Sequence, residues 1–271
     1  MTDSRIYVSS DSVASSDPYD IIWSNIGFLN ALQGEYLRKD ELSPDALLSY
    51  YVDYYLAQVN NGGFAQFVYN SSWHPVLIQY VRDGLEAMGA TEHLALFNQS
   101  AVILDSLGPD GVEKFLDGEF FGENSERDTL NAFNDRFYAL NKQHDLIDLN
   151  SRWLRAHPEL VVLTPEELED EVARRAEAVP DREARIAEAL ANEPRYTRLI
   201  RALCTESGQT LDAVTAGSPE TYNGQPCLAW HFLTDQGHHY MIDIGTESLM
   251  FNDDSDTPIA TFAIPADFGD E

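Results

Sequence analysis

Few residues of the chain have types and spacings that could do chemistry. Ser71 and His74 stand three positions apart, as a nucleophile and its base could, amid several amide side chains. Catalysis at such a pair also needs an orienting third group and an oxyanion hole, and the sequence supplies neither. Capping of a turn accounts for the same residues. A small-molecule or enzymatic cleft is kept as an alternative, with a lining of Asn60, Asn61, Gly62, Gly63, Phe64, Gln66, Asn70, Ser71 and His74.

The other chemical motifs are incomplete. His238 and His239 alternate along a predicted strand, so their side chains point to opposite faces and cannot share a metal ion. The run Asn252–Asp256 is as acidic as a calcium loop, but it lacks the glycine at position six and the glutamate at position twelve. The chain has no Walker loop, no GxGxxG after a strand and no HExxH. We expect no enzymatic activity, no metal site and no cofactor.

The element that positions the candidate cleft is a turn inside an uncharged segment. Tyr54–Val81 spans 28 residues without one Asp, Glu, Lys or Arg, which predicts the interior of the main domain. Its centre, NNGGF, combines residues that tolerate positive φ with two glycines, a pattern that stops helices. We expect Gly62 or Gly63 to have φ above zero, and Phe64 and Phe67 to be buried.

The charge of the chain is the second informative feature. Asp and Glu number 46 against 17 Lys and Arg, which gives a formal net charge of −29. Such a chain repels nucleic acid and acidic membranes and attracts basic surfaces, including those of DNA-binding proteins. The alternative is that acidity serves only solubility or reflects a salt-loving host. With no apolar run of membrane length and no signal peptide, the sequence predicts a cytoplasmic protein.

Helical signals dominate the first two thirds of the chain. Ser43-Pro44 is a strong helix start, followed by apolar residues at helical spacing as far as the NNGGF turn. Further helices are expected after Pro75 and from Thr91. Residues 18–163 therefore predict an all-helical, bundle-like domain, preceded by a loose N-terminus over residues 1–17.

The rest of the chain predicts a different architecture. Residues 164–194 are rich in Glu, Arg and Ala and predict a charged helical connector. Residues 195–271 predict a small acidic α+β domain, with an antiparallel sheet packed on a helix around Tyr196–Leu203. The fold class is thus mainly α. The expected strands are Cys227–Leu233 and His238–Ile244, joined by a hairpin at Asp235-Gln236-Gly237, then Leu249–Phe251 and Ile259–Ile264.

One stretch resembles a known family. Val59–Ser71, VNNGGFAQFVYNS, resembles the N-G-G-F-x-Q-(F/Y)-x-x-N-S signature of a bacterial domain family whose best-known member is an acidic DNA-mimic protein. Leu85–Ala90 and Asn134–Tyr138 resemble later segments of the same family. The resemblance covers about residues 43–149. It implies an all-α domain that can form a homodimer and a role as a DNA mimic.

The spacing of some acids suits mimicry. Carboxylates at i and i+4 on a helix rise about 6 Å, and alternate phosphates of one DNA strand rise about 7 Å. The alternative is a merely solvated helix face. Our leading interpretation is a non-enzymatic protein that binds a basic partner, such as a DNA-binding regulator, as a DNA mimic, without contacting nucleic acid or membrane. The second is an immunity or antitoxin-like inhibitor of a basic toxin. The expected contact residues are Asp110, Glu113, Asp117, Glu119, Glu123, Glu166 and Asp170.

Overall fold

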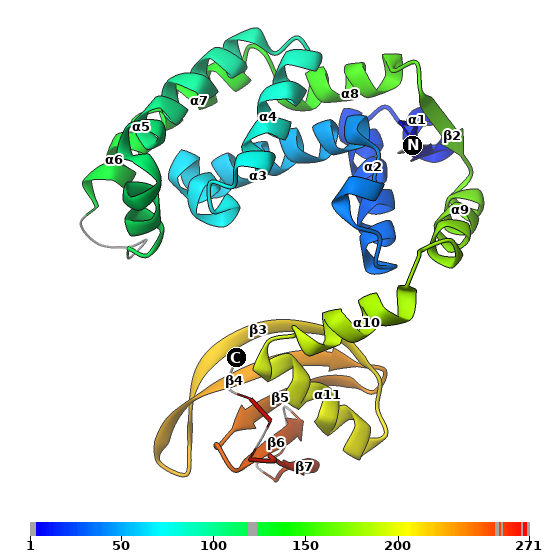
Figure 1. The fold of residues 1–271 in the computed structure, drawn as a ribbon, viewed down its shortest axis with the longest axis vertical. Helices are drawn as coiled ribbons and strands as arrows, with labels where there is room; N and C mark the ends of the chain where they lie inside the picture. The colour runs from blue at the N-terminus through cyan, green and yellow to red at the C-terminus, as the bar shows by residue number, and fades with distance from the viewer. Residues whose placement is uncertain (1–3, 119–123, 253–254, 256, 267, 270–271) are drawn as a thin grey trace. The chain divides into compact units, whose positions relative to one another are not determined.

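The chain folds into two compact units, Met1–Pro180 and Asp181–Glu271, coloured from blue to red along the chain in Figure 1. The structure is a computed structural model that describes residues 4–118, 124–252, 255, 257–266 and 268–269. Unit 1 is largely helical, and unit 2 carries an antiparallel five-stranded sheet. The predicted fold class is therefore confirmed.

The helices of unit 1 begin where the sequence places capping residues. The Ser43 hydroxyl accepts a hydrogen bond from the amide of Ala46, and Pro44 occupies the first helical position. Thr164 and Glu167 form a capping box at a later helix. The helices are α1 (Ser10–Ala14), α2 (Pro18–Gly34), η1 (Lys39–Glu41), α3 (Pro44–Ser71), α4 (Pro75–Ala87), α5 (Thr91–Leu116), α6 (Ser125–Asn131), α7 (Asn134–Asn141), α8 (Leu146–Ala156) and α9 (Pro165–Glu177).

An aromatic cluster forms the centre of unit 1. Tyr55, in the first half of α3, is 1% exposed and contacts the rings of four phenylalanines. Phe64 and Phe67 come from α3 beyond the turn, and both are buried as expected. The other two rings are those of Phe97 in α5 and Phe137 in α7, with centroids 5.2 and 5.6 Å from that of Tyr55. Edge-to-face contacts of this kind join three helices around one ring.

The expectation that unit 1 is free of strands was wrong. β1 (Ile6–Ser9) and β2 (Leu160–Leu163) pair in parallel. Ile6 and Val8 are fully buried, so the N-terminus is not loose from residue 6 onward. A strand of four residues carries almost no periodicity, and its partner lies some 150 positions away. The pairing is therefore a tertiary effect that local patterning does not reveal.

Unit 2 packs its sheet on one helix. The strands are in the order β3 (Leu211–Tyr222), β4 (Gln225–Thr234), β5 (Gly237–Asp243), β6 (Glu247–Asn252) and β7 (Ala260–Ala263). The helix α11 (Arg195–Ser207) lies against one face, where Leu199, Leu203, Phe232, Met241 and Met250 are buried. The predicted hairpin is confirmed, with Thr234 opposite Gly237.

Sequence patterning missed β3. Its pairing with β4 shifts register between Leu211 and Ala213 and again between Val214 and Ala216. Each shift breaks the alternation of faces, so no period of two runs through the strand. The segment 164–194, predicted as a connector, is divided at Pro180: α9 contacts α2 and β1 in unit 1, whereas α10 (Arg182–Ala191) falls in unit 2.

Candidate functional site

The NNGGF turn is a sharp break inside α3. Gly63 has φ +80° and ψ −177°, a conformation essentially restricted to glycine, and Gly62 is also non-helical. This confirms the expected positive φ. A Cβ on Gly63 would also clash with the Asn134 amide, 2.8 Å from its Cγ and 2.9 Å from Asn131 Oδ1. A glycine is therefore required at position 63 for two reasons: the backbone conformation, and the close approach of Asn134 and Asn131.

Two side chains of α7 bind the backbone on either side of this break. The Phe64 amide donates to Asn134 Oδ1 at 2.9 Å, and the Tyr138 hydroxyl donates to the Val59 carbonyl at 2.9 Å. A break in a helix frees such groups from the hydrogen-bond ladder, and buried backbone groups need partners. The segment Asn134–Tyr138 is thus a clamp on the turn. In the sequence this segment stands out only by its resemblance to the family, and its spacing indicates no role.

The amides expected to line a cleft bond to one another. Gln58 Oε1 accepts from Gln66 Nε2 at 3.1 Å and from Asn70 Nδ2 at 2.5 Å, so the three amides bridge the two halves of α3. Asn60 and Asn61 are exposed at the break. These contacts stabilise the turn, because polar groups around a break in a helix need hydrogen-bond partners.

Ser71 and His74 are not arranged as a nucleophile and its base. Ser71 is buried, and its hydroxyl donates to the Val68 carbonyl at 3.2 Å and accepts from the Trp73 amide at 3.3 Å. His74 is exposed, and its main-chain amide donates to the Ser71 carbonyl at 3.0 Å. Both residues shape the end of α3, where Ser72 and Trp73 have positive φ. Such capping is a structural role.

Three of the predicted contact residues form one exposed face near the end of α5. Asp110, Glu113 and Asp117 follow a kink at Gly108, where φ is +69°, and their spacing of three and four puts them on one side of the helix. No ion pair ties them to a Lys or Arg within the described part of the chain. We call Asp110, Glu113 and Asp117 the α5 acidic face. Glu119 and Glu123, predicted to extend it, lie outside the described residues.

The second half of α3, which follows the NNGGF turn, holds the α5 acidic face in place. Phe115, on the same helix, is buried against Tyr69 of α3, with ring centroids 4.8 Å apart. The Tyr69 hydroxyl donates to the Phe115 carbonyl at 2.9 Å and accepts from Asn124 Nδ2 at 3.3 Å. The break at Gly63 sets the direction of the segment that carries Tyr69. The turn therefore positions the acids indirectly.

The other predicted contact residues lie on α9. Glu166 and Asp170 are exposed, while the next acid, Glu171, bonds to Arg174 and Arg175 at 2.7 and 2.8 Å. These guanidinium groups lower the pKa of Glu171 to about 2. Figure 1 shows α9 and the end of α5 that leads to α6 at opposite ends of unit 1. The structure thus keeps the two acidic sets apart.

Comparison with known proteins supports the resemblance for part of the chain. Residues 40–157 match the family model of the DMP19-like protein, a DNA-mimic family. The match covers less than half of the chain and includes the NNGGF turn, the clamp and the α5 acidic face, but not α9 or unit 2. No curated protein and no solved structure matches the chain.

Among the residues that the structure describes, no helix is both long and apolar enough to cross a membrane.

Proposed function

We propose that this chain is a non-enzymatic protein that occupies the DNA-binding groove of a basic protein partner as a DNA mimic. One observation carries the proposal: the exposed α5 acidic face lies within residues 40–157, the part that matches the DMP19-like family. The partner class that fits is a DNA-binding regulator. A homodimer would present two copies of the face, and light scattering on the purified protein tests for it.

The geometry of the face supports binding in place of phosphates. Glu113 and Asp117 are one helical turn apart, a rise of about 6 Å that approaches the 7 Å or so between alternate phosphates. The packing of Phe115 on Tyr69 fixes the helix, so the carboxylates are ordered before binding. A rigid array loses less conformational entropy on association than a mobile one.

Charge reversal on the face tests the proposal. A partner is first captured from the host, and its affinity for labelled duplex DNA is measured with and without this protein. The wild-type chain should displace the DNA. The triple variant Asp110→Lys, Glu113→Lys, Asp117→Lys should lose displacement by about tenfold or more, because close charge pairs contribute strongly to such interfaces.

The matched control is a triple reversal on α9. Glu166→Lys, Glu169→Lys and Asp170→Lys make the same change of charge on exposed residues outside the family match. Glu166 and Asp170 were expected as contacts from the sequence, but α9 lies at the opposite end of unit 1 from the α5 acidic face, so this variant should displace DNA almost as well as wild type. If the two triple variants lost the same amount of DNA displacement, the partner would respond only to the net charge of the protein. A partner that binds this protein and duplex DNA together, with undiminished affinity for both, would rule out mimicry.

A specific observation favours the alternative of a toxin inhibitor. Tight inhibitors combine charge with an apolar anchor, and Trp23 of α2 is 62% exposed. It lines a groove of about 740 Å³ between α2 and α9, together with Leu168, Val172 and the acidic Glu169. A basic toxin could seat an apolar side chain there. Trp23→Ala should then weaken inhibition more than the α5 triple reversal does, whereas a DNA mimic predicts the opposite order.

A further inference from the structure

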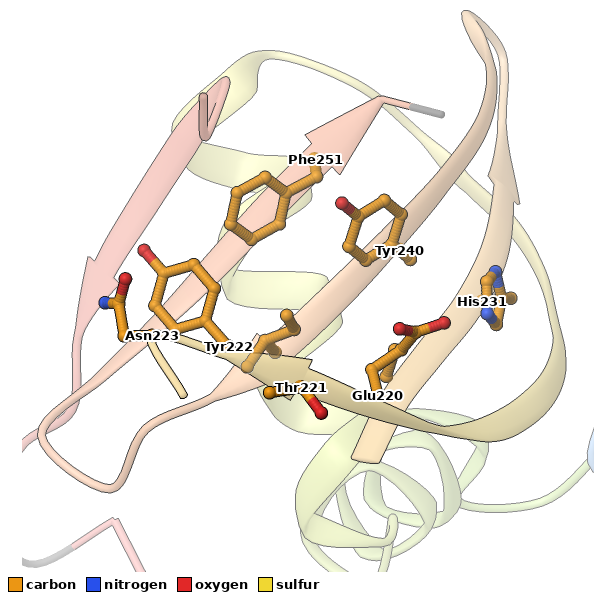
Figure 2. Close-up of a pocket in the computed structure, with 9 residues that line it drawn as sticks. Glu220, Thr221, Tyr222, Asn223, His231, Tyr240 and Phe251 are labelled. Carbon is orange, nitrogen blue, oxygen red and sulfur yellow. The ribbon is translucent and has the colours of Figure 1, made fainter. Parts of the chain in front are cut away.

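A hollow opens on the face of the unit 2 sheet that lies opposite α11. Its volume is about 560 Å³, and its walls come from β3, the turn after it, β4, β5 and β6. Figure 2 shows the side chains that line it. Those that matter for its chemistry are Glu220, Tyr222, Asn223, His231, Tyr240 and Phe251.

Strand alternation explains why these residues share a face. In the pairing of β3 with β4, Ser218 lies opposite Ala229 and Glu220 opposite Cys227. Beyond the register shifts, alternate residues of β3 from Ser218 to Tyr222 therefore point to the face that carries the hollow. Likewise, His231 of β4 lies opposite Tyr240 of β5, and Tyr240 lies opposite Phe251 of β6. The Phe232 side of the sheet faces α11 instead.

Three aromatic rings form the walls. The rings of Tyr240 and Phe251 are stacked, with centroids 5.0 Å apart and planes 11° apart. The ring of Tyr222 stands at 62° to that of Phe251, 5.8 Å away. Phe251 is 1% exposed and so holds the other two in place. Ring faces set at an angle attract a cation through the negative π-surface of each ring.

The charge of the hollow is negative. Among the described residues that line it, Glu220 supplies the only carboxylate, and Figure 2 shows this carboxylate turned toward the same space as the Tyr240 ring. Residues 202–271 contain twelve acids and not one Lys or Arg. The three arginines of α11 have partners of their own: Arg195 pairs with Asp243 at 3.1 Å, Arg198 donates to the Phe268 carbonyl at 3.0 Å, and Arg201 pairs with Glu193 at 2.8 Å. An anionic ligand would be repelled here, and a cationic one attracted.

The polar groups at the rim are held by the sheet itself. His231 Nε2 lies 2.8 Å from Ser218 Oγ, and the His231 ring stacks on that of His238 at 5.3 Å. The imidazole is thereby kept as part of the wall. Asn223, in the turn after β3, adds an amide whose oxygen can accept a hydrogen bond from an N–H group.

We propose that this hollow binds a cationic group, an ammonium or a guanidinium, against Glu220 and the faces of Tyr222 and Tyr240. The charge is balanced by the carboxylate, and the apolar part of the ligand lies on the rings. The source is either a free amine or the Lys or Arg side chain of a basic protein. The site lies outside residues 40–157, so it does not depend on the DNA-mimic function.

Titration of the full-length chain with small probes tests the site. Nα-acetyl-arginine amide represents a side chain, agmatine a free amine, and Nα-acetyl-citrulline amide a neutral ligand of nearly the same shape. Calorimetry at low salt should detect both cations, with the citrulline compound weaker by about tenfold or more. If agmatine binds with the same affinity as the arginine amide, the ligand is a free amine. Weaker binding of agmatine would indicate a protein side chain.

A pair of single substitutions locates the binding. Glu220→Gln removes the carboxylate and should weaken the binding of both cations by about threefold to fivefold, the range for an ion pair with an exposed carboxylate. Glu247→Gln makes the same change of charge at an exposed residue of β6 outside the hollow, and should have no effect. Glu220 is itself exposed, so the fold should persist, as circular dichroism can verify. Equal binding of the citrulline and arginine amides, the same affinity in both variants, or binding of no probe would overturn the proposal.

Discussion

Gly63 is the residue on which the arrangement of α3 most depends. Its φ of +80° with ψ near 180° is strained for any side chain, and an added Cβ would meet the Asn134 amide. We expect Gly63→Ala to lower the free energy of unfolding by about 3–5 kcal/mol, and Gly63→Val by at least as much. Urea unfolding followed by circular dichroism measures the loss.

Gly89 offers a matched control for this effect. It also has a positive φ, +70°, but nothing lies within 4 Å of an added Cβ. Gly89→Ala should therefore show only the backbone strain, about 1–2 kcal/mol. A loss at Gly63 no larger than that at Gly89 would show that the contact with the α7 clamp contributes nothing.

Asp53 makes stability depend on pH. Burial raises the pKa of this carboxyl from 3.8 to about 6, partly offset by a hydrogen bond from the Tyr19 hydroxyl. The folded chain therefore binds the proton more tightly than the unfolded chain. The resulting stabilisation is fully present below about pH 4 and is lost as the pH rises through about 6. Ionised Asp53 is thus unfavourable at neutral pH.

Replacing Asp53 with asparagine should remove this pH dependence. Asp53→Asn keeps an acceptor for Tyr19, so we expect a gain of about 2 kcal/mol at pH 7, with little change at pH 4. Urea unfolding at pH 4, 5, 6 and 7 measures the difference from wild type. Asp105→Asn, at an exposed acid of α5, controls for the loss of one negative charge. A gain from Asp53→Asn that is the same at every pH would contradict the assignment.

At the scale of elements, Tyr69 couples the second half of α3 to the end of α5. Tyr69→Phe keeps the ring on Phe115 and removes the two hydrogen bonds to the Phe115 carbonyl and Asn124. We expect a loss of about 1–2 kcal/mol in stability and a several-fold loss in partner affinity. Binding is measured by DNA competition, at a temperature where both proteins are folded. Tyr138→Phe, which removes a hydrogen bond of the clamp instead, should affect stability more than affinity.

Local signals predicted some elements well and others not at all. Ser43-Pro44 and the glycines of the turn encode their conformations within a few residues, and both are found as expected. The pairing of β1 with β2 depends on distant contacts, and the register shifts of β3 hide its alternation. The role of Asn134 is invisible to spacing for the same reason, since its partner, Phe64, is 70 positions away. Three-dimensional contacts decide these features, and propensity does not.

At the scale of the whole molecule, the distribution of charge separates two kinds of surface. The α5 acidic face belongs to unit 1 and to the segment with a family match, whereas the aromatic hollow around Glu220 belongs to unit 2. Both favour cations, the first by an exposed array and the second by a single carboxylate among rings. Salt should act more strongly on the face than on the hollow, because the face depends on exposed charges alone, whereas the hollow also offers ring faces to the apolar part of a ligand.

Salt dependence therefore distinguishes a DNA mimic from an anchored inhibitor. If the α5 acidic face binds the partner, affinity should fall by about tenfold or more between about 50 and 200 mM salt, since the contacts are exposed charges. The neutral triple variant Asp110→Asn, Glu113→Gln, Asp117→Asn should bind weakly at low salt and depend on salt much less. An inhibitor anchored at Trp23 buries apolar area and should lose little affinity over the same range. Calorimetry of each variant at several salt concentrations gives the slopes. If the affinities of the wild type and of the neutral variant fell equally with salt, the α5 acidic face would not be part of the interface.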